Sequence, residues 1–218
     1  MKFADFEKFI SASFPETDAR QTERFAALEG LYRDWNAKIN VISRKDIDSL
    51  YLHHVLHSLA VAAYLRSERP AEYGMAGKKV LDLGTGGGFP GIPLAILFPD
   101  AHFTLCDSVG KKTVVAGEVA KALGLENVAV VNARAETLPA SFDYVVSRAV
   151  TSLENFYPWV RGKFSEAVLY LKGGDVAEET ALLMARHRLR NGSVGTWRID
   201  RWIEDPYFAE KFVIDIRR

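Results

Sequence analysis

The sequence predicts an α/β fold in which a mostly parallel, doubly wound sheet carries helices on both faces, behind an all-helical N-terminal extension. Two observations predict it. From Val80 onward, short runs rich in β-branched residues alternate with amphipathic stretches, as is typical of such sheets. Before about residue 68, apolar residues recur every three or four positions, which is the period of a helix.

The composition is that of one globular unit of moderate size. The chain has 218 residues, of which 48% are hydrophobic and 26% are charged, enough for one substantial core. The 28 basic and 28 acidic side chains balance, so net charge alone does not indicate a nucleic-acid partner. No apolar run is long enough to span a membrane, no signal peptide follows Met1, and the single cysteine, Cys106, cannot form an internal disulfide. We therefore expect a cytoplasmic protein without membrane contact.

Residues 1–68 are expected to form the helical extension, on the substrate side and as part of the same unit. In RFAALEGLYRDWNAKIN, apolar residues recur at spacings of three and four, namely Phe25, Leu28, Leu31, Tyr32 and Trp35, and LYLHHVLHSLAVAAYL repeats the pattern. The polar stretch RSERPAEYGMAGKK then indicates a linker to a core that spans 78–218.

Seven strands are expected in that core. Five of them are KKVLDLG, HFTLCDS, NVAVVNA, FDYVVSRAV and AVLYLKGG, and most are separated by predicted helices such as KKTVVAGEVAKALGL. The last two, VGTWRIDRWI and EKFVIDIRR, are joined by EDPYFA. They predict an antiparallel pair at the sheet edge.

Glycines crowd the turn after the first strand, in VLDLGTGGGFPGIPLAI. Ligands of open α/β sheets bind beyond the carboxyl ends of the strands, where Gly84, Gly86 and Gly88 stand. Lacking Cβ, these residues let the backbone approach a ligand or adopt positive φ. The alternative is a tight turn that only packs the next helix on the sheet.

The nature of the ligand follows from the residues around the glycines. A dinucleotide fingerprint requires a sixth-position glycine, where Phe89 stands instead. The carboxylate of Asp82 disfavours pyrophosphate and suits a cation, and S-adenosylmethionine carries both a sulfonium and an ammonium group. Asp107 closes the second strand, where a carboxylate accepts the ribose hydroxyls of an adenosine, unless it only caps the following helix. After the third strand, Ala135 and Glu136 are expected beside the adenine, although Glu136 is also consistent with an exposed loop residue.

Several motifs resemble one known family. DWNAKINVISRKD, HHVLHSLA, VLDLGTGGGFPGIPLAI, DSVGKK, RAE and FDYVVSRAV are similar to those of the glucose-inhibited division protein B family, the RsmG rRNA methyltransferases, over about residues 20 to 175. The resemblance implies a class I S-adenosylmethionine-dependent methyltransferase with a Rossmann-like, mostly parallel seven-stranded sheet. The implied reaction is methylation of N7 of guanine 527 (conventional numbering) in the 530 loop of 16S rRNA. Its implied cofactor contacts are Gly84, Phe89, Ala135, Glu136 and Arg148.

The implied partners are 16S rRNA and the small ribosomal subunit or its assembly intermediate, and we expect a monomer. Basic residues that favour an RNA track, unless they are only solvated faces, are Arg44, Lys45, Lys111, Lys112 and the run Arg186 to Arg190. Asn36 and Asn40 are either caps or substrate contacts.

The residues after the fourth strand agree with attack by a ring nitrogen. Enzymes that methylate exocyclic amines or carbon usually place an Asn/Asp-Pro-Pro-aromatic loop or a reactive cysteine there, whereas this chain has SRAV, and Cys106 lies within the second strand. N7 of guanine presents a free lone pair, so no general base is expected. Arg148 and Lys172 follow the fourth and fifth strands and are predicted to position ligands at the mouth of the site, although Lys172 is equally consistent with an ordinary turn residue.

Two alternative functions remain at this point. One is an S-adenosylmethionine-dependent methyltransferase that acts on a small molecule or a protein, and the other is a nicotinamide-dependent enzyme or nucleotide-binding module, which Asp82 and Phe89 disfavour. His53 and His57 stand four residues apart, as metal ligands on a helix do, but no further ligand completes a site. No metal is therefore expected.

Overall fold

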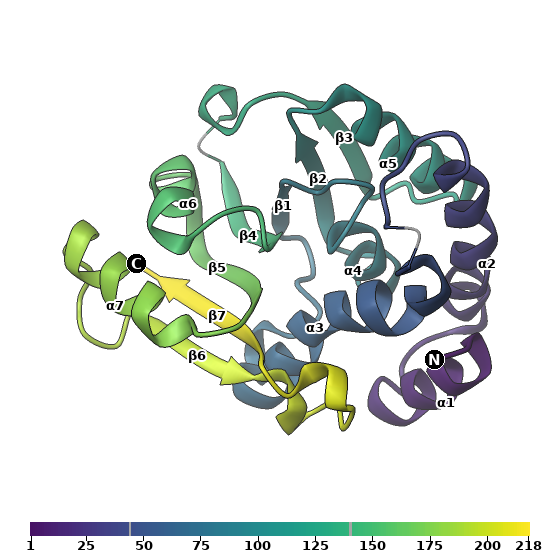
Figure 1. Cartoon of the computed structure of the whole chain (residues 1–218), viewed down its shortest axis with the longest axis horizontal. Helices are drawn as coiled ribbons and strands as arrows, with labels where there is room; N and C mark the ends of the chain where they lie inside the picture. The colour runs from purple at the N-terminus through teal and green to yellow at the C-terminus, as the bar shows by residue number, and fades with distance from the viewer. Residues whose placement is uncertain (44, 140) are drawn as a thin grey trace.

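The structure is a computed structural model that describes residues 1–43, 45–139 and 141–218. Its centre is a seven-stranded sheet of order β3-β2-β1-β4-β5-β7-β6 (Figure 1). The strands are β1 (Lys79–Leu83), β2 (His102–Asp107), β3 (Val128–Asn132), β4 (Phe142–Arg148), β5 (Phe164–Gly173), β6 (Val194–Arg198) and β7 (Lys211–Arg217).

The pairing confirms the predicted mostly parallel sheet. β1 to β5 pair in parallel, and β7 pairs antiparallel with both β5 and β6. The antiparallel C-terminal pair was therefore predicted correctly, whereas the insertion of β7 between β5 and β6 was not predicted. The strand expected over VGTWRIDRWI is shorter than predicted, because a 3-10 turn at Ile199–Arg201 follows β6.

Helices cover both faces of the sheet. They are α1 (Phe3–Ser13), α2 (Ala19–Asn36), α3 (His57–Glu68), α4 (Gly91–Leu97), α5 (Gly110–Ala122), α6 (Leu153–Val160) and α7 (Val176–His187). One core cluster contains buried residues of α1 to α5, and the other contains those of α6 and α7. Successive strand residues alternate between the clusters: Val80 belongs to the first and Leu81 to the second, as the two-residue period of a strand requires.

The N-terminal helices are built into the sheet's own core. Gln21 is buried and bonds at both ends: its backbone N–H donates to Asp18 Oδ1 at 2.7 Å, and its Nε2 donates to the carbonyl oxygens of Ile96 and Leu97 at 2.8 and 3.0 Å. The first bond caps α2, and the other two satisfy carbonyls at the end of α4, which have no partner within that helix. A polar contact thus fixes the extension against the helix that follows the glycine loop.

The predicted helix over LYLHHVLHSLAVAAYL is present but begins irregularly. Leu50–Leu56 is a π-helix, and α3 follows it directly. Short π-helical segments are rare and are frequently found at functional sites. None of the described helices is long and apolar enough to cross a membrane.

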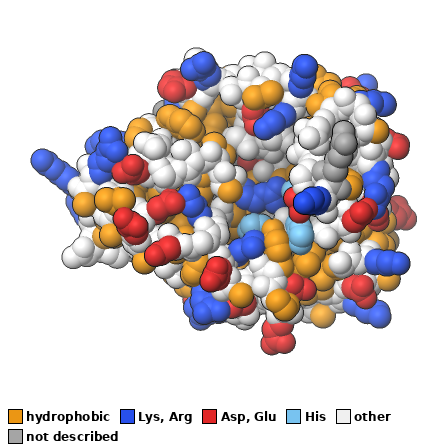
Figure 2. Space-filling model, in the orientation of Figure 1, with side chains coloured by type: hydrophobic (Ala, Val, Ile, Leu, Met, Phe, Trp, Pro, Cys, Tyr) orange, Lys and Arg blue, Asp and Glu red, His pale blue; other side chains and the backbone are white. Residues whose placement is uncertain are grey.

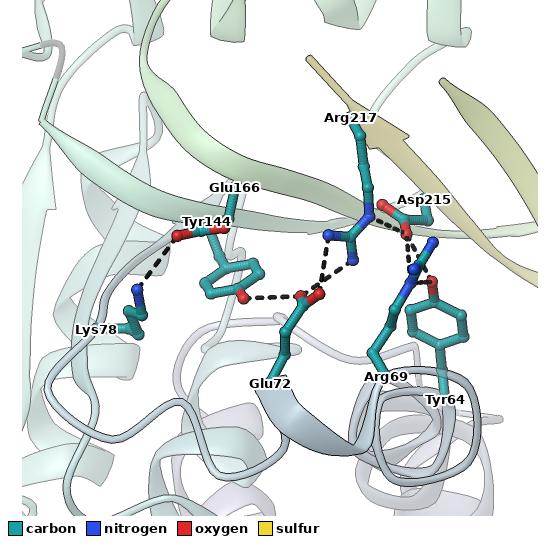
Figure 3. A network of polar contacts seen from close by, with 8 residues as sticks. All are labelled: Tyr64, Arg69, Glu72, Lys78, Tyr144, Glu166, Asp215 and Arg217. Atoms are coloured by element: carbon teal, nitrogen blue, oxygen red, sulfur yellow. Dashed lines mark hydrogen bonds and ion pairs between the residues drawn. The ribbon is translucent and has the colours of Figure 1, made fainter. Parts of the chain in front are cut away.

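The segment predicted as a linker is fastened to the sheet by polar contacts (Figure 3). Glu72 accepts hydrogen bonds from both terminal nitrogens of Arg217, at 2.9 and 3.0 Å, and from the Tyr144 hydroxyl at 2.8 Å. Asp215 Oδ2 accepts from Tyr64 Oη at 2.5 Å and from Arg217 Nε at 2.7 Å. Because Asp215 is only 2% exposed, this network joins α3 and the following segment to β7 below the surface.

Candidate functional site

A cavity lies where the order of the sheet reverses. β1 pairs with β2 on one side and with β4 on the other, so their carboxyl ends flank the position at which open α/β sheets bind ligands. The cavity there has a volume of about 550 Å³. Figure 2 shows a hollow near the centre of the face, with basic and histidine side chains along part of its rim. The predicted cofactor residues that line it are Gly84, Asp107, Ala135, Glu136 and Arg148.

Gly84 forms the wall of the cavity at the end of β1. Its φ is +74°, and a Cβ on it would collide with Cγ2 of Val150, which also lines the cavity. Its N–H donates to the carbonyl oxygen of Cys106 at 2.8 Å. A residue without a side chain is therefore required both by the backbone conformation and by the close approach of the loop after β4.

Asp107 ends β2 on the cavity wall with both carboxylate oxygens engaged. Oδ2 accepts from the Gly86 N–H at 2.9 Å, and Oδ1 accepts from the Val109 N–H at 2.8 Å. The bond from Val109 resembles the helix-capping role that the sequence allowed for Asp107 as an alternative to ribose binding. Since each carboxylate oxygen has two lone pairs, the carboxylate retains acceptor capacity toward the cavity.

If Asp107 accepts hydrogen bonds from the ribose hydroxyls as predicted, the Asp107→Ala variant should bind S-adenosylhomocysteine more weakly by about 1 to 3 kcal/mol. Isothermal titration calorimetry measures the change. Asp100→Ala, an exposed carboxylate in the turn after α4, is the control with the same charge change. An unaltered dissociation constant in folded Asp107→Ala protein would refute the role in ribose binding.

Asp82 lies apart from the cavity. It is fully buried, and its Oδ2 accepts from Thr85 Oγ1 at 2.6 Å and from the Gly91 N–H at 2.7 Å. Burial raises its pKa to about 7, while these two hydrogen bonds oppose that rise. In this position Asp82 holds the glycine loop to the first residue of α4, and its predicted contact with the cofactor stays a prediction.

Three other residues of the glycine loop that were predicted to contact the cofactor also lie outside the cavity lining. Among the described residues of the loop, Gly86 and Gly88 have positive φ but do not line the cavity, and neither does Phe89. The Phe89 ring lies between Tyr32, with centroids 4.7 Å apart, and the guanidinium of Arg148, 5.3 Å from its centroid. Phe89 thus supports Arg148 from the side of the N-terminal helices.

Arg148 connects the end of β4 to the π-helical segment. Its Nη1 donates to the His53 carbonyl oxygen at 3.1 Å, and its Nη2 lies 2.9 Å from His54 Nδ1. Burial, together with the charge of Arg148, lowers the pKa of His54 to about 3. The imidazole is therefore neutral at pH 7 and accepts at Nδ1, because a guanidinium only donates. Arg148 lines the cavity and at the same time fixes the N-terminal helices beside it.

The loop after β4 is held by a buried hydroxyl. Tyr170 Oη accepts from the N–H groups of Val150 and Thr151 at 2.8 and 3.1 Å and donates to the Thr151 carbonyl oxygen at 2.8 Å. Ala149, between Arg148 and this loop, has a φ of +48°, a strained conformation for a residue with a side chain. Tyr170 thus stabilises a strained segment of the cavity wall.

Replacing Tyr170 by phenylalanine should lower the free energy of unfolding by about 1 to 3 kcal/mol, because two backbone N–H groups lose their acceptor and the Thr151 carbonyl oxygen loses one of its two donors, while the ring remains. Denaturant titration measures this loss. The control is Tyr157→Phe, since that side chain is also largely buried and no described residue forms a hydrogen bond with its hydroxyl. Equal losses in the two variants would mean that the Tyr170 hydroxyl does not stabilise the loop.

Lys172 stands at the end of β5 as predicted but has partners within the protein. Its Nζ lies 2.7 Å from Glu179 Oε1 of α7 and donates to the Thr151 carbonyl oxygen at 3.2 Å. It does not line the described cavity. Lys172 therefore holds the loop after β4 through Thr151. Its predicted role in positioning a ligand stays a prediction.

Other predicted candidates have structural partners. Asn36 organises its loop: its Oδ1 accepts from the N–H groups of Val41 and Ile42, at 2.9 Å each. His53 Nδ1 lies 2.9 Å from Asp46, whereas His57 packs against Tyr207 and Phe208. Within the described ranges, no group of three His, Cys, Asp or Glu side chains is arranged to hold a metal ion.

Two further predictions can be followed up. Arg44, a predicted member of the RNA track, lies outside the described residues. Cys106 is a buried residue of β2, as predicted, and burial raises the pKa of its thiol.

Several cavity residues were not assigned to the cofactor site from sequence. They are Leu83, Ser108, Lys112, Ala133, Arg134, Ala149, Val150 and Trp159. Trp159 has a recognisable signal: α6 buries its other large apolar residues, Leu153, Phe156, Tyr157 and Val160, whereas Trp159 is only partly covered. An aromatic residue left at the edge of a helix that borders a ligand site is a candidate for stacking.

Comparisons with known proteins agree with the fold and the motifs. Residues 21–195 match the model of the GidB family, described as rRNA small subunit methyltransferase G. Proteins of that name from Christiangramia forsetii and Bacteroides fragilis are 51% and 52% identical to the chain over 215 residues, covering 95% of this chain and 95% and 98% of theirs.

Two solved structures share the architecture. Magnesium protoporphyrin IX methyltransferase from Synechocystis, with bound SAM, has a TM-score of 0.60 at 14% identity and covers 92% of this chain and 98% of its own. A SAM-dependent methyltransferase from Aquifex aeolicus has a TM-score of 0.50 at 18% identity and covers 65% and 82%. At such identities the likeness shows the fold, which is that of class I methyltransferases. The family resemblance predicted from the motifs is confirmed by the match over most of the chain, and the protein belongs to the rRNA small subunit methyltransferase G family.

Proposed function

We propose that this protein transfers a methyl group from S-adenosylmethionine to N7 of guanine 527 (conventional numbering) in 16S rRNA. The observation that carries the proposal is the family match over residues 21–195, which includes every described residue that lines the cavity. The relatives at about half identity are named for the small-subunit rRNA.

The cavity fits the cofactor in size and chemistry. Its volume of about 550 Å³ lies within the range of small-molecule sites. We assign Asp107 to the ribose hydroxyls, Gly84 to the backbone wall, and Ala135 and Glu136 to the adenine side. When bound, S-adenosylmethionine supplies an electrophilic methyl group on a sulfonium. Asp82 supports the same site indirectly, since it holds the glycine loop to α4.

The residues that line the cavity support a reaction driven by alignment. N7 of guanine carries an available lone pair, so no proton has to leave before the methyl group is transferred. Asp107 is engaged with two backbone amides, and Arg148 is engaged with the π-helical segment. Both side chains are therefore suited to hold ligands in place rather than to transfer protons.

We assign positioning roles to Arg148 and Lys172. Arg148 ties the cavity wall to the N-terminal helices, and Lys172 ties the loop after β4 to β5 and α7. A guanidinium pressed against the guanine would oppose the positive charge that N7 acquires during methylation. The observed partners of Arg148 agree with a place beside the ring and not against it.

We further propose that the protein acts in the cytoplasm, as a monomer, on the small ribosomal subunit or its assembly intermediate. Three cations, Lys112, Arg134 and Arg148, line the cavity against two acids, Asp107 and Glu136, and this excess of positive charge supports an anionic partner.

The test is transfer of labelled methyl from S-adenosylmethionine to small subunits that lack their modifications, followed by nucleoside analysis. Label recovered as 7-methylguanosine from the 530-loop fragment is the expected result. If the protein binds S-adenosylhomocysteine by calorimetry yet labels no RNA, the cofactor assignment survives and the substrate is a small molecule or a protein.

A further inference from the structure

A second groove borders the cofactor cavity. It has a volume of about 410 Å³ and lies between the loop after α2 and the start of α5. Its described lining residues are Lys38, Ile39, Asn40, Val109, Lys111 and Lys112. Three of the six are cations and none is an acid. Because Lys112 also lines the cofactor cavity, the groove is adjacent to the proposed active site.

The cations of this groove are not neutralised by the protein. Within the described part of the chain, Lys38, Lys111 and Lys112 form no ion pair, in contrast to Lys78 and Lys172, which pair with glutamates at 3.2 and 2.7 Å. Lys38 has an aromatic neighbour instead: its Nζ lies 4.8 Å from the centre of the Trp35 ring. Three like charges side by side repel one another, so they favour a polyanion.

The groove is also partly apolar. Val109 is 45% exposed and is among the few large apolar side chains at the surface of the described chain. Ile39 adds a further apolar wall. A free inorganic anion would gain nothing from these side chains, whereas a nucleic-acid strand presents sugars and bases as well as phosphates.

The loop that carries Lys38 is held in place before any ligand binds. The Asn36 side chain accepts from two backbone N–H groups of the loop and donates to the Ile42 carbonyl oxygen at 2.9 Å. Val41 packs directly on Gly87 of the glycine loop, where an added Cβ would lie 2.9 Å from its Cγ2. A groove fixed in this way requires little ordering on binding, which favours affinity.

We propose that this basic groove binds the phosphate backbone of the RNA strand that adjoins the target guanine. The proposal rests on the proposed function, because it places the strand next to the cavity in which that guanine reacts. It adds a surface that orients the RNA, formed by the loop after α2 together with α5. Asn40 and Val109 contact sugars or bases there, and the lysines contact phosphates.

The test is the double variant Lys38→Gln/Lys111→Gln, which leaves Lys112 and the cofactor cavity unaltered. Its matched control, Lys8→Gln/Lys121→Gln, removes the same charge from two exposed lysines outside the groove. Methyl transfer is measured with unmodified small-subunit rRNA transcribed in vitro and with small subunits lacking modifications. S-adenosylhomocysteine binding is measured by calorimetry as a check on the fold.

We expect the groove variant to raise KM for both RNA substrates about tenfold at low salt, with little change in kcat. The plot of log KM against log salt should become shallower by roughly 1.4 to 1.8, as expected for two lost phosphate contacts. Cofactor affinity should equal that of the wild type, and the control should behave like the wild type in every measurement.

Three results would overturn the proposal in distinguishable ways. Equal KM and salt dependence in the groove variant and its control would refute RNA binding by the groove and leave the proposed function unaffected. A raised KM with assembled subunits but not with protein-free rRNA would assign the groove to an acidic ribosomal protein. If the wild-type protein methylates no RNA, both the proposed function and the proposed role of the groove are refuted.

Discussion

Replacing Arg217 by methionine is expected to lower the free energy of unfolding by about 3 to 5 kcal/mol, as when one partner of a buried ion pair is removed. The guanidinium is bound by Asp215 and by both carboxylate oxygens of Glu72 (Figure 3). Methionine retains most of the length of the side chain but cannot donate. Asp215, only 2% exposed, would then keep the Tyr64 hydroxyl as its close donor, with Arg69 more distant at 3.8 Å.

Denaturant unfolding measures this effect against an exposed ion pair. Arg33→Met removes an exposed guanidinium that pairs with Glu29 and Asp48, both also exposed, and should cost only about 0.5 to 1 kcal/mol. Similar losses in the two variants would show that the network around Arg217 is not a stabilising core.

The same network predicts a dependence on pH. Burial opposes the ionisation of Glu72, but hydrogen bonds from Arg217 and Tyr144 hold its pKa below the ordinary value of 4.5. A lowered carboxyl pKa stabilises the fold above pH 4.5, and this stabilisation is lost as the pH falls through the lowered pKa. Wild-type stability should therefore fall more steeply on acidification than that of Arg217→Met. Parallel curves would contradict the assignment.

The Gly84→Ala variant is expected to lose about 3 kcal/mol of unfolding free energy, from a non-glycine residue at positive φ and from overpacking. The new methyl group would collide with Val150, a branched side chain with little rotamer freedom. Relief requires movement of the loop after β4, which forms part of the cofactor cavity. Affinity for S-adenosylhomocysteine should consequently fall as well.

Two further variants separate the causes of that loss. Gly86→Ala introduces the same kind of strain, at a φ of +57°, but its Cβ would meet no atom within 4 Å. It should cost about 1 to 2 kcal/mol, the backbone strain alone. Adding Val150→Ala to Gly84→Ala should restore the part of the stability that was lost to overpacking, because the methyl groups that collide with the new Cβ are removed. If Gly84→Ala and Gly86→Ala lose equal stability and Val150→Ala rescues neither, the approach of the two loops is not what requires a glycine at Gly84.

Much of the fold could be predicted from sequence because its signals are local. The two-residue period of strands such as FDYVVSRAV and the helical period of RFAALEGLYRDWNAKIN depend only on neighbouring residues. The glycine turn after β1 and the acid that ends β2 follow from the same kind of pattern, and the cavity does lie between them. The local pattern could not predict the π-helix at Leu50–Leu56, because a single wider turn leaves apolar spacing nearly unchanged.

The sequence by itself determined the order of strands and helices, the glycine loop at the sheet's switch point, and the motifs that carry the family. Only the tertiary structure decided which side chains face the cavity. Asp82 turned toward Gly91, Lys172 toward Glu179 and Arg148 toward the π-helical segment. A charged group that leaves water needs a partner, and that partner comes from whichever element packs nearby, which is a long-range property that no local pattern encodes.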